Sequence, residues 1–206
     1  MQNMPKTSLK LGIAAAICVV LVVGYYFLPK LPAKVLAKKE LASNPDSLKL
    51  MQAVELVQGP NPMEGITLLR ELIAKDSNNV DAHLYLGMFS VKSNQMDKAI
   101  KRFDKVLALR PSDARYQVEV GYQYLQMDSV LRAYECFERG VLADSTDNNS
   151  LFFLGQTSER LLLTAQAKRC YEQLLRHTSD SLVVSNVQQY IIEINKKLNN
   201  SDNALR

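Results

Sequence analysis

Hydrophobic and small residues recur along the chain at a fixed spacing of 34 residues. Each period contains a large apolar residue followed by glycine; an alanine comes thirteen residues after that apolar residue, and an aromatic residue comes four further on. Such periodicity marks a stack of supersecondary units, each too small to bury its apolar face alone. Glycine and alanine predict close helix approaches, and the aromatic residue lies one helical turn after the alanine on the same face. The recurring residues are Leu86-Gly87, Val120-Gly121, Leu154-Gly155, Ala99, Ala133, Ala167, Phe103, Phe137 and Tyr171.

The same period predicts pairs of helices joined by short turns. We expect these pairs at 46–57 and 63–75, 80–93 and 96–109, 114–127 and 130–143, and 148–161 and 164–177. A repeat stack needs a terminal element with a polar outer face, and residues 182–198 fit a capping helix. Its predicted apolar stripe consists of Val184, Val187, Ile191 and Ile194 or Leu198. Residues 199–206 are polar and are expected to form a disordered tail.

Three of these units resemble the tetratricopeptide repeat (TPR), whose pattern has Leu-Gly on a first helix and Ala, an aromatic residue and Pro on or after a second. They span residues 80–113, 114–147 and 148–181, and a degenerate unit at 46–79 has Ala53 in place of the glycine and Gly65 in place of the alanine. The resemblance implies an all-α fold, a right-handed superhelix of four stacked helix-turn-helix units at 46–181. It also implies a concave groove lined by the first helix of each pair.

Carried onto this sequence, the groove positions of the family give an apolar surface with a polar rim. Some TPR modules bind a carboxyl terminus with Lys and Asn at two of these positions, which hold apolar residues and Tyr122 here, so that clamp is absent. The predicted partner is therefore a protein or peptide with an apolar or amphipathic segment. Coverage of the groove by the chain's own segment 29–44 is the alternative. The candidate groove residues are Leu84, Met88, Val91, Val118, Tyr122, Leu125, Phe152 and Gln156.

Residues 11–28 are eighteen residues without a charge, which we interpret as one transmembrane helix. At about 1.5 Å per residue, this helix spans roughly 27 Å, close to the hydrocarbon thickness of a bilayer. A cleaved signal peptide is the alternative, but its apolar region would be unusually long. The chain then divides into an N-terminal tail at 1–10, the membrane helix at 11–28 and a juxtamembrane linker at 29–45.

Candidate chemistry is sparse. The chain has only two histidines, His83 at a packing position and His177 at a helix end, and no catalytic, metal-binding or phosphate-binding motif. Cys136 and Cys170 occupy the same place in consecutive units and are expected to be small core residues. The net charge of +4 is inflated by juxtamembrane lysines. Elsewhere acids and bases are interspersed, and no basic face with interleaved aromatic residues stands out. We therefore expect no enzyme, no cofactor, no metal, no small-molecule substrate and no nucleic-acid partner.

Two functions fit these features. The first is a membrane-anchored scaffold or adaptor that binds a protein partner in the groove, for assembly, maturation or chaperoning of an envelope complex. The second is a permanent structural subunit of a larger membrane complex with no exchangeable ligand. We expect a single-pass protein of a bacterial inner membrane with the repeats extracytoplasmic, because an N-terminal apolar segment acts as a signal-anchor. The lysine count on the two sides of residues 11–28 slightly favours the cytoplasmic alternative.

Overall fold

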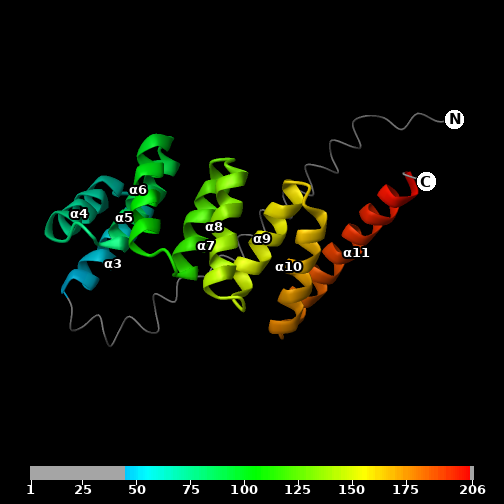
Figure 1. Ribbon diagram of the computed structural model, residues 1–206. Coiled ribbons are helices and arrows are strands. Elements are labelled where there is room, and N and C mark those ends of the chain that lie inside the picture. Colours follow the sequence, from blue (N-terminus) through cyan, green and yellow to red (C-terminus); the bar gives the residue numbers. More distant parts are fainter. Residues whose placement is uncertain (1–44, 205–206) are drawn as a thin grey trace. The chain divides into compact units, whose positions relative to one another are not determined.

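A computed structural model describes residues 45–204, and every regular element among them is an α-helix (Figure 1). The predicted membrane helix at 11–28 lies outside these residues, as does the linker up to residue 44. Between residues 45 and 204, no helix combines the length and hydropathy that crossing a membrane requires. The helices are α3 (Pro45–Gln58), α4 (Pro62–Lys75), α5 (Val80–Lys92), α6 (Met96–Leu109), α7 (Ala114–Gln126), α8 (Val130–Ala143), α9 (Asn148–Arg160), α10 (Thr164–His177) and α11 (Ser181–Ala204).

The ends of α3 to α10 lie within one residue of the ranges that the period predicts. The helices pair as antiparallel neighbours, α5 with α6, α7 with α8 and α9 with α10, and successive pairs pack in chain order. The first helices of consecutive pairs, α5, α7 and α9, also contact one another. The handedness of the stack stays a prediction.

The recurring glycines lie where two helices of a pair approach most closely. A Cβ atom built on Gly121 would lie 2.7 Å from Cε1 of Phe137, and one on Gly87 would overlap Phe103 in the same way. These aromatic residues are completely buried, so the predicted packing of a ring against a small residue of the paired helix is confirmed. In the degenerate first unit the roles are reversed, since a Cβ on Gly65 would lie 2.5 Å from the carbonyl oxygen of Ala53.

The period also appears in the backbone. Asn79, Asp113 and Asp147 stand 34 residues apart, and each side chain accepts a hydrogen bond from an amide in the first turn of the following helix. Within each later pair the turn contains one residue in the left-handed region, with φ of 56° at Asn94, 53° at Asp128 and 61° at Leu162. Asparagine and aspartate tolerate this conformation, whereas leucine adopts it only under strain.

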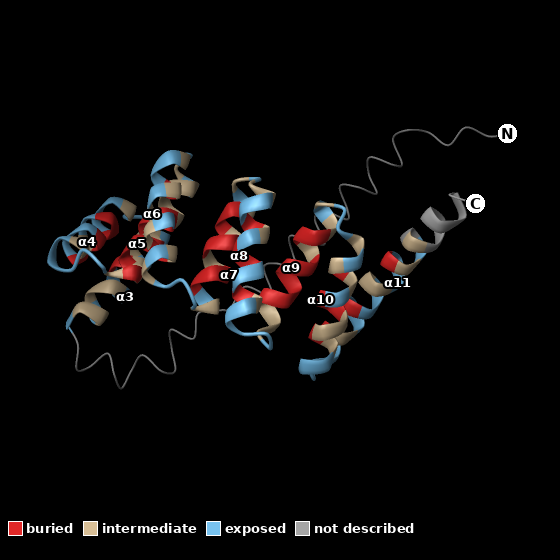
Figure 2. Ribbon diagram, viewed as in Figure 1, coloured by how far each residue is buried: buried red, intermediate tan, exposed pale blue. Residues whose placement is uncertain are grey.

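Burial is greatest on the first helices (Figure 2). The buried segment 151–155 lies in the middle of α9, and buried residues also face inward from α5 and α7. The second helices α6, α8 and α10 bury one stripe each and expose the rest, which gives them the stronger amphipathic pattern. Cys136 and Cys170 are buried free thiols, as expected of small core residues.

The last helix differs from its prediction in two respects. It continues as a helix to Ala204, so the disordered tail expected from residue 199 is wrong over this stretch. Val183 is buried and Val184 only partly so, which means that Val183 takes the place expected for Val184 in the buried stripe. Tyr190 then stacks on Tyr171 of α10 with ring centroids 5.4 Å apart. The predicted Val187 and Ile194 are completely buried.

Candidate partner-binding surfaces

The predicted groove residues occupy equivalent places on α5, α7 and α9, and we call them the first-helix face. Three are buried: Leu84, Val118 and Phe152 are 4%, 5% and 1% exposed. The other five, Met88, Val91, Tyr122, Leu125 and Gln156, are partly exposed. The accessible part of the face is therefore the apolar row on α5 and α7, continued by a glutamine on α9.

Phe152 requires a correction, because it is a packing residue and not an open contact. Its ring centroid lies 6.5 Å from that of Tyr171 and 6.4 Å from that of Tyr190. The side chain thus fills the space among α9, α10 and α11. The repeat pattern does not include α11, which is why the sequence placed Phe152 on the surface.

Tyr122 is the aromatic residue of the first-helix face that remains partly exposed. Its ring lies 6.0 Å from Phe153 on the next first helix, and burial raises the pKa of its hydroxyl. A side chain held on one side and open on the other suits an anchor for a partner, because tyrosine buries a large area with few rotatable bonds.

Polar residues join the beginnings of α5 and α7. The hydroxyl of Tyr116 donates to Asp81 at 2.9 Å, and the Arg115 guanidinium lies 3.4 Å from the same carboxylate and 4.1 Å from the Tyr116 ring centroid. Burial raises the pKa of Glu119 nearby; Arg115 opposes this shift and Asp81 adds to it. Asp81, Arg115 and Tyr116 thus bind one another and join α5 to α7.

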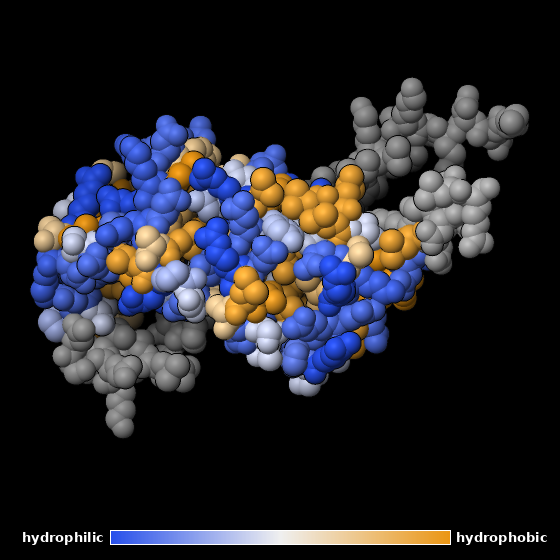
Figure 3. Space-filling view, in the orientation of Figure 1, coloured by the Kyte–Doolittle hydropathy of each residue, from blue (hydrophilic) through white to orange (hydrophobic). Residues whose placement is uncertain are grey.

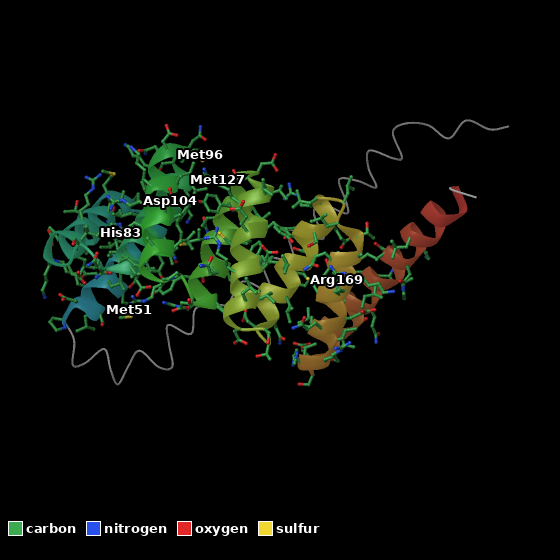
Figure 4. The ribbon with its side chains drawn as sticks, viewed as in Figure 1. Met51, His83, Met96, Asp104, Met127 and Arg169 are labelled. Atoms are coloured by element: carbon green, nitrogen blue, oxygen red, sulfur yellow. The ribbon has the colours of Figure 1, made fainter. Side chains whose placement is uncertain are left out.

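A second concave surface lies between α4 and α6, over α5, and sequence reasoning missed it. We call this pocket of about 520 Å³ the α4–α6 groove. His83 lies within it, between α4 and α6 (Figure 4). Its lining residues are Met63, Ile66, Arg70, His83, Leu86, Phe89, Ser90, Gln95, Lys98, Lys101, Arg102 and Lys105.

His83 is held as a neutral acceptor in this groove. It is 6% exposed; its Nε2 donates to the Ser77 carbonyl at 3.0 Å, and its Nδ1 accepts from Arg102 at 2.9 Å. Burial lowers the pKa of His83, and the charges of Arg102 and Lys105 lower it further. The packing role expected for this histidine is correct, but it also orients a guanidinium.

One face of α6 carries a row of basic residues. Lys98, Lys101, Arg102 and Lys105 follow the i, i+3, i+4, i+7 spacing of one helical face. That spacing was visible in the sequence, and counting charge over the whole chain hid it. The hydrophilic surface over α4 and α6 is broad in Figure 3.

The rest of residues 45–204 offers little further chemistry. No cluster of His, Cys, Asp or Glu in this part of the chain could hold a metal ion. Burial raises the pKa of Cys136 to about 12 and that of Cys170 to about 11, so both thiols are poor nucleophiles near neutral pH. A second pocket of about 430 Å³, the α6–α8 groove, includes Asp104, Arg132, Glu135 and Arg139. It repeats the α4–α6 groove one unit further along.

Comparison with known proteins supports the repeat assignment. Residues 61–118 match the model of the family described as Tetratricopeptide repeat. This segment contains α4, α5 and α6, and hence the whole α4–α6 groove. No curated protein sequence matches the chain.

Solved structures share the fold. A crystal structure of MamA protein is 17% identical, with a TM-score of 0.61 over 78% of this chain and 86% of that chain. The pilF protein of Pseudomonas aeruginosa is 20% identical, with a TM-score of 0.62 over 75% of this chain and 69% of that chain. MamA from Desulfovibrio magneticus RS-1 is 18% identical, with a TM-score of 0.60 over 78% and 89%. The family match indicates tetratricopeptide-type repeat sequence at residues 61–118, and these likenesses show a helical-repeat fold.

Proposed function

We propose that the protein is a membrane-anchored scaffold that binds an apolar or amphipathic segment of a protein partner on its first-helix face. The observation that carries this proposal is the row of partly exposed apolar side chains at equivalent places on two neighbouring helices. Met88 and Val91 supply it from α5, and Tyr122 and Leu125 supply it from α7. A continuous apolar row flanked by satisfied polar groups suits a helix or an extended peptide.

The membrane part of the proposal rests on residues 11–28. Their length and lack of charge suit a single-pass anchor, and we place the repeats on the extracytoplasmic side. A reporter fused after Arg206 that is active only in the cytoplasm tests this placement. Activity of that reporter would mean that the repeats lie in the cytoplasm, and the proposed scaffold role would still stand.

The binding role is tested by capture of partners from detergent-solubilised membranes with the full chain and with Tyr122→Ala. Loss of this anchor should weaken binding by about 1–3 kcal/mol, the range for truncation of an interface hot spot. Leu142→Ala is the matched control, because that side chain is 80% exposed on α8 and away from the first-helix face. Partner loss with Leu142→Ala, or unfolding with Tyr122→Ala, would count against the first-helix face.

One observation favours the second candidate, a permanent structural subunit. Leu131, Leu162 and Leu163 are 61%, 85% and 43% exposed. An apolar patch covers the start of α8 and the α9–α10 turn in Figure 3. Exposed apolar patches of this kind often lie in stable interfaces. Salt-resistant recovery of one stoichiometric protein would favour this candidate, whereas several substoichiometric proteins would favour the scaffold.

A further inference from the structure

The α4–α6 groove has a strongly one-sided charge. Five cationic side chains line it, Arg70 from α4 and Lys98, Lys101, Arg102 and Lys105 from α6, and no carboxylate lines it. Like charges brought together repel one another and cost stability unless a counter-charge is present. The groove therefore carries a positive potential that its own lining does not neutralise.

Within residues 45–204, none of these five cations forms an ion pair. Lys98 donates to the Gln95 side chain at 2.6 Å, Lys105 to that of Asn78 at 3.0 Å, and Arg102 to His83. All three acceptors are neutral. Burial lowers the pKa of Arg102, and the nearby charge of Arg70 lowers it further. The groove thus holds three of its five cations with neutral partners and leaves their charge available.

The repeat supplies an internal reference for this charge. One period later, Asp104 stands where Arg70 does and Glu135 where Lys101 does, while Arg132 and Arg139 replace Lys98 and Lys105, and Cys136 replaces Arg102. Two acids and two bases then leave the α6–α8 groove neutral. Because the backbone pattern is the same in both units, folding does not require the positive charge of the first groove.

The floor of the α4–α6 groove is apolar. Ile66 and Leu86 are 4% and 6% exposed, Phe89 is partly exposed, and Met63 stands at the edge with 64% exposure. A recess with an apolar floor and cationic walls can receive an apolar side chain flanked by carboxylates. A bilayer surface or a nucleic-acid duplex would meet the lysines without reaching the floor.

We propose that the α4–α6 groove is a second docking surface that binds an acidic segment of a protein partner, with an apolar side chain of that segment seated on Ile66, Leu86 and Phe89. This surface is separate from the first-helix face, since Leu84, Met88 and Val91 lie on another side of α5. Binding here therefore goes beyond the proposed function and does not depend on it.

The test uses the full chain in detergent and a fluorescent synthetic peptide with two central leucines flanked on both sides by glutamates. The groove variant Lys98→Gln, Lys101→Gln, Lys105→Gln should weaken binding by about tenfold or more, because it removes three charges facing the peptide. The matched control is Arg132→Gln, Arg139→Gln, Arg169→Gln, which removes three cations at corresponding repeat positions outside the groove. It should change binding by less than about twofold.

Two altered peptides separate the contribution of the cationic walls to binding from that of the apolar floor. Replacing the glutamates with glutamine should abolish binding, and replacing the leucines with serine should weaken it by about tenfold. Raising the salt concentration should weaken binding of the original peptide, because surface charges are screened. Circular dichroism should give the same helix content for all variants, since the replaced side chains lie on the surface.

Other occupants give different results. If vesicles containing phosphatidylserine bind and lose binding in the groove variant while the peptide does not bind, the groove recognises lipid head groups and the proposal is overturned. If the groove variant and the control variant weaken peptide binding equally, the binding depends only on the net charge of the protein. That result would also overturn the proposal. Loss of partner capture by Tyr122→Ala bears only on the first-helix face, so the two proposals fail independently.

Discussion

The α4–α6 and α6–α8 grooves are built on one backbone pattern and differ in their side chains at the surface. In both, a glycine on the first helix receives an aromatic ring from the second, Gly87 with Phe103 and Gly121 with Phe137. The walls differ, since five cations line the first groove and a balanced set of charges lines the second. In this protein, the repeated positions determine the fold, and the positions between them give each groove its own binding chemistry.

The largest expected effect tests whether the internal packing of the two grooves is equivalent. Phe103→Ala and Phe137→Ala should each lower the free energy of unfolding by about 3–5 kcal/mol, because both rings are completely buried. The two losses should agree within about 1 kcal/mol if the packing is the same. Urea denaturation followed by circular dichroism measures both.

Leu142→Ala serves as the control for this pair, since its exposed side chain should contribute within about 0.5 kcal/mol. A Phe103→Ala loss far smaller than that of Phe137→Ala would mean that the units differ in their core as well as at the surface. The comparison would then no longer isolate charge.

A smaller effect is expected from exchanging charge between the grooves. Lys101 lies three residues from Lys98 and four from Lys105, and Glu135 has the same spacing to Arg132 and Arg139. The Arg139 guanidinium lies 3.6 Å from the Glu135 carboxylate. Glu135→Lys should therefore lower the free energy of unfolding by about 0.5–1 kcal/mol. Lys101→Glu should raise it by at most about 0.5 kcal/mol, because the new carboxylate also meets Asp97 and Asp104 at helical spacing.

Thermal unfolding at low and high salt measures this exchange. The changes in the free energy of unfolding of both variants should be smaller at high salt, because exposed charges are screened. An unchanged melting temperature for Lys101→Glu at low salt would show that the cations of the α4–α6 groove do not repel one another appreciably.

Sequence alone predicted the elements that depend on a local period. The helix pairs, the glycine–aromatic contacts and the buried cysteines all follow from residues at fixed spacing. Phe152 could not be placed this way, since its burial depends on Tyr190 of a helix outside the repeat. The α4–α6 groove was missed for a related reason, because Arg70 meets the lysines of α6 only after two units pack. Periodicity identifies a residue's helix and face, and the neighbours of that face come from the tertiary structure.

The smallest expected effect concerns His83 and its counterpart one unit later. Gln117 donates to the Pro111 carbonyl at 2.9 Å, as His83 does to that of Ser77. His83→Gln should therefore keep this hydrogen bond and the fold while removing the titrating group. The folded state holds the pKa of His83 below its ordinary value of 6.5, so the unfolded state takes up the proton first as the pH falls. The free energy of unfolding of the unaltered protein should decrease as the pH drops below about 6.5.

The difference between the unaltered protein and His83→Gln isolates this imidazole. Asp76 raises its pKa while Arg102 and Lys105 lower it, and the variant removes all three influences together. Glu119, whose pKa is raised, titrates in both proteins, so its contribution cancels in the difference. When the pH is lowered from 7.5 to 5.5, the melting temperature of the unaltered protein should fall further than that of the variant. Equal falls would mean that His83 accepts a proton in the folded groove as readily as in the unfolded chain, which its burial and the charges of Arg102 and Lys105 should prevent.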